Sequence, residues 1–387
     1  MLFVGTEFGL WISVDDGRSW AEFKGSNFPR VAVRDLAVQP RDNDLVIATH
    51  GRGIWIVDDI SPLRALNDTV LASDVTFLDS RPVQQRISAN GGWPGGDAAF
   101  TGGNPTDGAV ISYYQKTRHV FGRLKMEVLD AAGKVIDTLP AGKRKGINRV
   151  TWSMHVKPPR VPTAAQPAFG SSQGPRVLPG KYTIRLTKGG QVYTQSLDVG
   201  LDRRAKFGVA ERRAQFAAVM EAHALFGQMT DLIDRLNGIK AMTTERAAAP
   251  AATKQARQML TALADKAEAL RKQVVATKEG GAITGEERLR EQLDYAYGAL
   301  SSFEGQPAPY QIERVHVLAR ELQEVETAAA ALARDDLPRA NSQLKNLGLA
   351  PLTIAEARQR GEQIAALQAL EAVHEEQALG NARRERD

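Results

Sequence analysis

The chain has 387 residues, which is enough for two or three domains that each bury their own core. It has no cysteine, which excludes disulfides, thiol catalysis and thiolate metal sites, and it contains no run of about 18 apolar residues that would indicate a membrane span. The net charge of +5 is uneven, since residues 1–200 carry 24 Lys and Arg against 18 Asp and Glu, whereas residues 201–387 carry 26 against 27.

The first motif follows an alternating apolar run that ends at Ile12. Ser13, Asp15, Gly17 and Trp20 fit the pattern Ser-x-Asp-x-Gly-x-x-Trp, which is an Asp-box. The Asp can accept hydrogen bonds from backbone N–H groups of a turn, the Gly can adopt a positive φ, and the Trp ring can fold over the hairpin. The motif therefore predicts a structural clasp between neighbouring strands.

Residues 1–62 also contain an internal repeat. The segment 4–12 resembles the segment 47–56, with Thr6 and Thr49 43 residues apart. Each copy predicts a strand, a Gly-containing hairpin and a second strand, at the spacing of β-propeller blades. We predict one to two terminal β-propeller blades here. Because so few blades cannot close a ring, we expect further blades to be encoded before Met1.

Asp58 and Asp59 are the carboxylates at the end of this region. Adjacent residues of an extended chain point to opposite faces, so these two side chains cannot flank one glycosidic bond as acid and base. We interpret them as capping groups of the turn that leaves the blades.

Residues 70–200 predict a β-sandwich of immunoglobulin or fibronectin-like type, because short strand-like segments alternate with turn signals. The first predicted strand is 71–78, and a Pro-rich loop at 158–180 is expected to be mobile or to form a contact surface. The other predicted strands are 109–114, 123–129, 134–139, 146–152, 181–187 and 191–199.

The densest basic cluster is Lys143, Arg144 and Lys145 with Arg149, between two predicted strands. A nucleic-acid site would need exposed aromatic residues among these charges or a recognition helix, and the sequence shows neither. We therefore interpret the cluster as a solvated hairpin loop and predict no nucleic-acid partner.

Residues 205–387 predict an antiparallel bundle of four or five helices, with a linker at 243–253. Apolar residues recur there at spacings of three and four, as expected for bundle seams. Three seams are Leu260, Leu263, Ala267, Leu270 and Val274; Leu289, Leu293, Ala296, Leu300 and Phe303; and Val315, Leu318, Leu322, Val325, Ala329 and Leu332.

The histidines do not form a recognisable site. His223, His316 and His374 fall on three different predicted helices without metal-ligand spacing. No Ser-containing nucleophile elbow and no phosphate-binding Gly-x-x-x-x-Gly-Lys loop accompanies the histidines of the β part. We predict no catalytic residue, no metal site and no cofactor in this chain.

Several segments together resemble bacterial sortilin-like, BNR (Asp-box) repeat β-propeller proteins, which are often labelled glycosyl hydrolases. They are the Asp-box, residues 127–130 with 133–135, residues 146–152, residues 178–183 and the run from 334 to 352. The resemblance covers most of residues 1–352 and implies an extracytoplasmic protein, periplasmic or secreted. It does not establish an activity, because fold alone does not determine function.

Two functional hypotheses follow. In the first, the chain is a non-catalytic accessory and interaction portion of such a protein, whose intact propeller binds peptide or glycan. In the second, the intact protein is a glycoside hydrolase whose catalytic carboxylates lie in missing blades, and a pair of inward-facing carboxylates at glycosidase separation would distinguish it. The residues of this chain favour the first.

Overall fold

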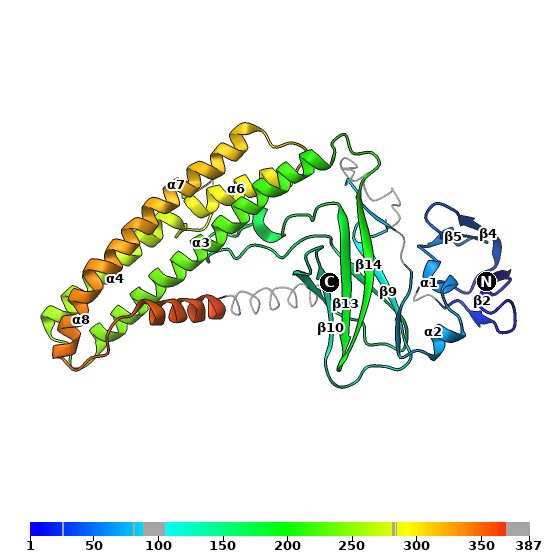
Figure 1. Cartoon of the computed structure of the whole chain (residues 1–387), viewed down its shortest axis with the longest axis horizontal. Helices are drawn as coiled ribbons and strands as arrows, with labels where there is room; N and C mark the ends of the chain where they lie inside the picture. Colours follow the sequence, from blue (N-terminus) through cyan, green and yellow to red (C-terminus); the bar gives the residue numbers. More distant parts are fainter. Residues whose placement is uncertain (25–26, 80–81, 88–104, 281–282, 284, 369–387) are drawn as a thin grey trace. The chain divides into compact units, whose positions relative to one another are not determined.

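The computed structural model describes residues 1–24, 27–79, 82–87, 105–280, 283 and 285–368. As expected, β strands occupy the first part of the chain and helices the second (Figure 1). The chain divides into two compact units. One comprises Met1–Val156 and Val177–Lys206, and the other comprises Lys157–Arg176 together with the helices from Phe207 onward.

The N-terminal residues form two three-stranded antiparallel sheets, ordered β1-β2-β3 and β4-β5-β6. The two copies of the sequence repeat are the β1–β2 and β5–β6 hairpins, in which Val4 pairs with Trp11 and Ile47 pairs with Trp55. Both sheets contribute to one apolar core around Leu10. The strands are β1 (Leu2–Thr6), β2 (Gly9–Ser13), β3 (Ala21–Glu22), β4 (Val33–Gln39), β5 (Asp44–Thr49) and β6 (Ile54–Val57).

Two short helices, α1 (Ser61–Arg64) and α2 (Asp68–Ala72), follow these sheets. The strand predicted at 71–78 is wrong at its start, because α2 includes its first two residues and β7 covers only Val75–Phe77. Asn67 explains the difference, since its side-chain oxygen accepts a hydrogen bond from the Val70 N–H and caps α2.

The remaining strands form a five-stranded sheet, ordered β11-β10-β13-β14-β8, and a three-stranded sheet, ordered β12-β9-β7. The two sheets bury one shared core, in which Trp152 packs edge-on against Tyr182 with ring centroids 5.2 Å apart. The sequence did not predict β8 or its parallel pairing with β14. The strands are β8 (Val83–Gln85), β9 (Ala109–Gln115), β10 (Leu124–Leu129), β11 (Val135–Leu139), β12 (Gly146–Trp152), β13 (Gly180–Lys188) and β14 (Gln191–Leu201).

The helical unit is built around one long helix, α3, which packs alongside α4, α6 and α7 (Figure 1). Its core contains the predicted seam residues, apart from Phe303, which is exposed because α6 ends two residues before it. In the described part of the chain, no helix is both long and apolar enough to cross a membrane. The elements are α3 (Val209–Ala248), α4 (Lys254–Val274), α6 (Leu289–Ser301), α7 (Pro309–Ala331), the π-helical turn η2 (Leu332–Asp336), α8 (Leu337–Asn346) and a helix at 354–368.

The linker predicted at 243–253 is only partly correct, because α3 continues to Ala248. The hydroxyl of Thr243 bonds to the Ile239 carbonyl one turn earlier, and the alanines that follow have high helix propensity. Pro250 then interrupts the helix, and Thr253 caps α4 by accepting a hydrogen bond from the Ala256 N–H.

The Pro-rich segment 157–176 belongs to the helical unit rather than to the β strands on either side of it in the sequence. It contains a single 3₁₀ turn, η1 (Gly170–Ser172), which lies against α6. In this part of the chain the loop therefore packs against its own helical unit.

Helix α3 and the helix at 354–368 approach each other through two glycines. A Cβ atom at Gly238 would lie 1.7 Å from the carbonyl oxygen of Ala357, and a Cβ atom at Gly361 would lie 1.8 Å from the carbonyl oxygen of Asp234. Real atoms cannot approach so closely, so any larger residue must separate the helices.

We expect Gly238→Ala to lower the free energy of unfolding by about 1–3 kcal/mol, because the added methyl group has no space. Gly227 of the same helix is the matched control, since a Cβ atom added there would meet no other atom within 4 Å. Gly227→Ala should raise the stability by about 0.5–1 kcal/mol through helix propensity. Urea unfolding followed by circular dichroism measures both, and equal stabilities of the two variants would contradict the close contact.

Candidate functional site

The structure brings Ser13, Asp15 and Gly17 of the Asp-box together in one turn. The Ser13 hydroxyl donates to Asp15 Oδ1 at 2.8 Å and accepts from the Gly17 N–H at 2.8 Å. The Asp15 carboxylate also accepts from the Ser19 N–H at 2.9 Å. Gly17 has a φ of +92°, a conformation in which a Cβ atom would be strained. The turn is therefore held by side-chain-to-backbone hydrogen bonds.

Trp20, the last Asp-box residue, closes the same turn. Its indole Nε1 donates to the Gly17 carbonyl at 3.2 Å, and its ring lies over the glycine. The ring stays partly exposed, so this Trp contacts the turn rather than filling a core. Hydrogen bonds connect all four Asp-box residues within one turn, so each of them has a structural role.

The hydrogen bonds of the turn perturb the pKa of Asp15. The Ser19 hydroxyl and N–H, followed by the Ser13 hydroxyl, stabilise the carboxylate and lower its pKa from 3.8 to about 2. At neutral pH this side chain is therefore a deprotonated carboxylate that already accepts several hydrogen bonds, so it is poorly suited to donate a proton in catalysis.

Asp59 and two of the histidines singled out in the sequence also have structural partners. Asp59 accepts a hydrogen bond from the Ser61 N–H at the start of α1, which agrees with a capping role. His223 bonds to the Lys157 carbonyl and His316 pairs with Glu221, whereas His374 lies outside the described residues. Among the residues that the structure describes, no group of three or more His, Cys, Asp or Glu side chains could hold a metal ion.

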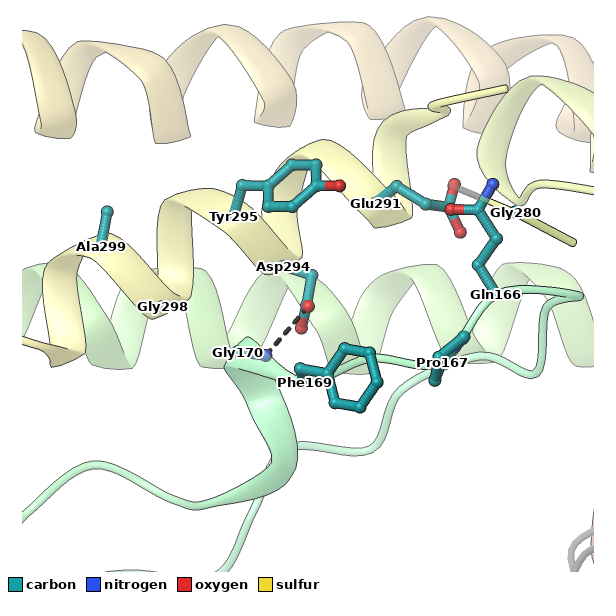
Figure 2. Close-up of a pocket in the computed structure, with 10 residues that line it drawn as sticks. All are labelled: Gln166, Pro167, Phe169, Gly170, Gly280, Glu291, Asp294, Tyr295, Gly298 and Ala299. Carbon is teal, nitrogen blue, oxygen red and sulfur yellow. Dashed lines mark hydrogen bonds between the residues drawn. The ribbon is translucent and has the colours of Figure 1, made fainter. Parts of the chain in front are cut away.

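A cavity in the helical unit is the site that the sequence did not reveal (Figure 2). It has a volume of about 550 Å³ and lies between α6 and the Pro-rich segment. Two carboxylates, two aromatic rings and several glycines line it. The lining residues are Gln166, Pro167, Phe169, Gly170, Gly280, Glu291, Asp294, Tyr295, Gly298 and Ala299.

Asp294 fixes the Pro-rich segment to α6. Although it is buried, its carboxylate accepts hydrogen bonds from the Gly170 N–H at 3.0 Å, the Ser171 N–H at 2.8 Å and the Ser171 hydroxyl at 2.6 Å. The approach requires a glycine, because a Cβ atom at Gly170 would lie 2.3 Å from the Asp294 carbonyl oxygen. Three donors stabilise the buried charge and hold the turn in place.

Glu291 performs the same function one helical turn earlier. Its carboxylate accepts from the Ala276 N–H at 3.2 Å, the Arg288 N–H at 3.0 Å and the Arg290 guanidinium at 2.9 Å. Residues three apart on a helix share a face, so both acids point toward the chain that covers α6. Both carboxylates are therefore engaged in holding backbone segments together.

The rim of the cavity is aromatic and lies in a negative field. Phe169 and Tyr295 are both exposed. The neighbouring Glu287 carboxylate, with smaller contributions from Asp294 and Glu291, raises the pKa of the Tyr295 hydroxyl. This combination of exposed rings and negative charge suits a small cationic or apolar group better than an anion.

The sequence of α6 contains polar residues that belong to this cavity, but its local periodicity does not identify their partners. Glu291 and Asp294 lie beside the apolar seam of this helix at a spacing of three, and Gly298 follows four residues after Asp294. Buried acids beside a seam require partners, and the loop at 158–180 supplies them. That loop lies more than a hundred residues earlier, so local periodicity could not connect the two.

Comparison of the chain with protein-family models, with curated proteins and with solved structures found no match. The interpretation of its function therefore depends on its own residues.

The low pKa of Asp15 predicts a pH dependence. Its folded-state pKa of about 2 is below the ordinary value of 3.8, so its stabilising contribution is complete above about pH 4 and is lost as the pH falls toward 2. Asp15→Asn should lower the melting temperature at neutral pH, and the difference from the unmodified chain should shrink as the pH approaches 2. Asp16→Asn is the control, and a constant difference for Asp15→Asn at every pH would contradict the role of the charge.

The anchor at Asp294 predicts local opening on mutation. Asp294→Ala leaves the donors at Gly170 and Ser171 without their acceptor, which should destabilise the helical unit by about 3 kcal/mol. Hydrogen exchange over residues 166–172 should become faster. Ser172→Ala removes only a hydroxyl bonded within the turn and should leave exchange unchanged. Full protection in Asp294→Ala would show that other contacts hold the segment.

Proposed function

We propose that the chain is a non-catalytic accessory and interaction portion of an extracytoplasmic, sortilin-like β-propeller protein. The observation that carries the proposal is the packing of the two N-terminal sheets, which use opposite faces of the same repeated unit.

The sequence repeat has a structural basis in its hairpins. In the first copy the Thr6 hydroxyl donates to the Gly9 carbonyl at 3.0 Å, and in the second the Thr49 hydroxyl donates to the Gly53 carbonyl at 2.6 Å. These equivalent bonds align the strands that follow. Leu10 therefore corresponds to Ile54.

The aligned positions differ in burial. Leu10 is 0% exposed in the core between the sheets, whereas its counterpart Ile54 is 72% exposed. Ile12 and Ile56 repeat the contrast, since Ile12 packs on the core and Ile56 is exposed. The face that the first sheet buries is thus the face that the second sheet leaves open.

The reverse holds for the opposite faces. Val4 is 43% exposed and pairs with Trp11, which is also exposed. Their counterparts are Ile47, which is 0% exposed, and Trp55, which packs on the core. The first sheet therefore leaves open the face that the second sheet buries.

Two like units in contact through unlike faces form a head-to-tail interface. Such an interface leaves one complementary face free at each end, and repetition produces either a closed ring or an open stack. A ring of these sheets is a β-propeller. The exposed apolar faces support further sheets of the same repeat as partners.

The other regions fit an accessory role in this proposal. The paired sheets of residues 70–200 would be the immunoglobulin or fibronectin-like sandwich, and sandwich and helical bundle would both serve as accessory parts of the propeller. Peptide or glycan would bind to the intact propeller. The propeller assignment and the extracytoplasmic location rest on the Asp-box and on the resemblance of residues 127–135, 146–152, 178–183 and 334–352 to the sortilin-like family.

The glycoside hydrolase alternative has no specific support among the residues that the structure describes. Such an enzyme requires two carboxylates placed on either side of a glycosidic bond. Asp15 is used in its turn and Asp59 in a cap, and both acids of the helical cavity hold backbone segments. The alternative therefore depends on residues of further blades.

The free faces should make the chain associate with itself. We expect its weight-average mass in sedimentation velocity to rise with concentration, because the open face of β6 in one copy complements that of β1 and β2 in another. Ile54→Glu combined with Ile56→Glu should abolish the rise. Val192→Glu, at an exposed apolar position of β14, is the matched control. A monomer at all concentrations, or equal effects of all the substitutions, would contradict the proposal.

A further inference from the structure

Two loops at one end of the paired sheets lie side by side. One, residues 116–123, connects β9 to β10, and the other, residues 140–145, connects β11 to β12. The His119 N–H donates to the Lys143 carbonyl at 3.0 Å and joins the two. The basic cluster that the sequence assigned to a solvated hairpin therefore has a neighbour that the sequence did not place beside it.

The first loop presents two apolar side chains to solvent. His119 is buried beneath it, and its Nε2 donates to the Gly122 carbonyl at 3.1 Å, which closes the tip of the loop. Gly122 has a φ of +89°, as a tight turn requires. Val120 and Phe121, between these residues, are 62% and 89% exposed. The tip therefore projects apolar groups from a hydrogen-bonded base.

The second loop is held by buried polar groups. The Asn148 side chain accepts from the Arg144 N–H at 3.1 Å and donates to the Arg144 carbonyl at 2.8 Å. The hydroxyl of Tyr113 donates to the Gly142 carbonyl. These bonds fix the backbone of the loop while its long cationic side chains remain in solvent.

The two loops carry charge of one sign only. Between them they contain six exposed Lys and Arg residues and no Asp or Glu. By contrast, Lys188 in the next hairpin pairs with Asp74 at 2.7 Å. In the described part of the chain, no carboxylate pairs with the six cations, which are Lys116, Arg118, Arg123, Lys143, Arg144 and Lys145.

We propose that these two loops form a docking site for the surface of an anionic phospholipid bilayer. Val120 and Phe121 would enter the boundary between head groups and acyl chains, while the surrounding cations contact phosphate groups. Apolar groups at the tip and cations without a carboxylate partner in the same two loops match both layers of such a surface. A tip fixed by His119 also loses little conformational entropy on insertion.

Nucleic acid is a poorer match for the same loops. Single strands bind along grooves in which several aromatic rings stack on successive bases. Phe121 is the one aromatic residue of the two loops, and the adjacent Val120 has no ring to stack. Val120 and Phe121 therefore favour a lipid surface, which can bury both side chains, over a nucleic acid, which would contact only the cations.

The test is sedimentation of the full chain with phosphatidylcholine vesicles that contain phosphatidylglycerol. We expect binding to these vesicles at low salt and little binding to pure phosphatidylcholine. Phe121→Ser should weaken binding roughly ten-fold through the lost apolar burial. Lys143→Gln combined with Lys145→Gln should weaken it roughly five-fold for each charge removed.

Matched controls lie elsewhere on the β unit. Phe8→Ser removes an equally large exposed ring, and Lys134→Gln removes an exposed cation at the opposite end of β10; neither should change binding. Absence of binding to the anionic vesicles would overturn the proposal. So would a Phe121→Ser variant that binds as well as the unmodified chain, or equal affinity for a labelled single-stranded DNA, because each indicates attraction by charge alone. Melting temperatures of the variants exclude loss of folding as the cause.

Discussion

The packing of Leu10 between the two N-terminal sheets is the interaction on which the account of this protein depends. It buries one face of the β1–β2 hairpin against the opposite face of the β5–β6 hairpin, although the two hairpins are copies of one repeated unit. The hydrophobic effect favours the same burial at every copy. A hairpin that buries only one of its two faces leaves apolar surface exposed to solvent. Ile54 lies on this exposed face of the second hairpin.

The helical unit contains two buried carboxylates that hold the Pro-rich segment and its neighbours against α6. Asp294 and Glu291 face the chain that covers α6, and hydrogen-bond donors of the protein stabilise both carboxylates, with the Arg290 guanidinium among the donors to Glu291. A buried carboxylate without such donors would be strongly unfavourable. The hydrogen bonds to Asp294 thus make the Pro-rich segment contribute to the stability of the helical unit. Both carboxylates that line the cavity beside it already have this structural role.

Much of the fold could be predicted from the sequence because it is encoded locally. The Asp-box residues, the repeated hairpins and the helical seams depend on contacts within a few turns or one hairpin. The parallel pairing of β8 with β14 could not be predicted, since Val83 and Val199 are far apart in the sequence and no periodicity joins them. The same holds for the contact of Ser171 with Asp294 and for that of His119 with Lys143, where long-range packing determines which polar groups find partners.

Directed disulfide cross-linking tests the head-to-tail claim most directly, because the chain has no cysteine of its own. Val4→Cys places a thiol on the open face of the first sheet, and Ile56→Cys places one on the open face of the second. If unlike faces meet, a mixture of the two single variants forms disulfide-linked dimers much faster under mild oxidation than either variant alone. Equal rates in the mixture and in the separate variants would show that the faces are not complementary and would contradict the account.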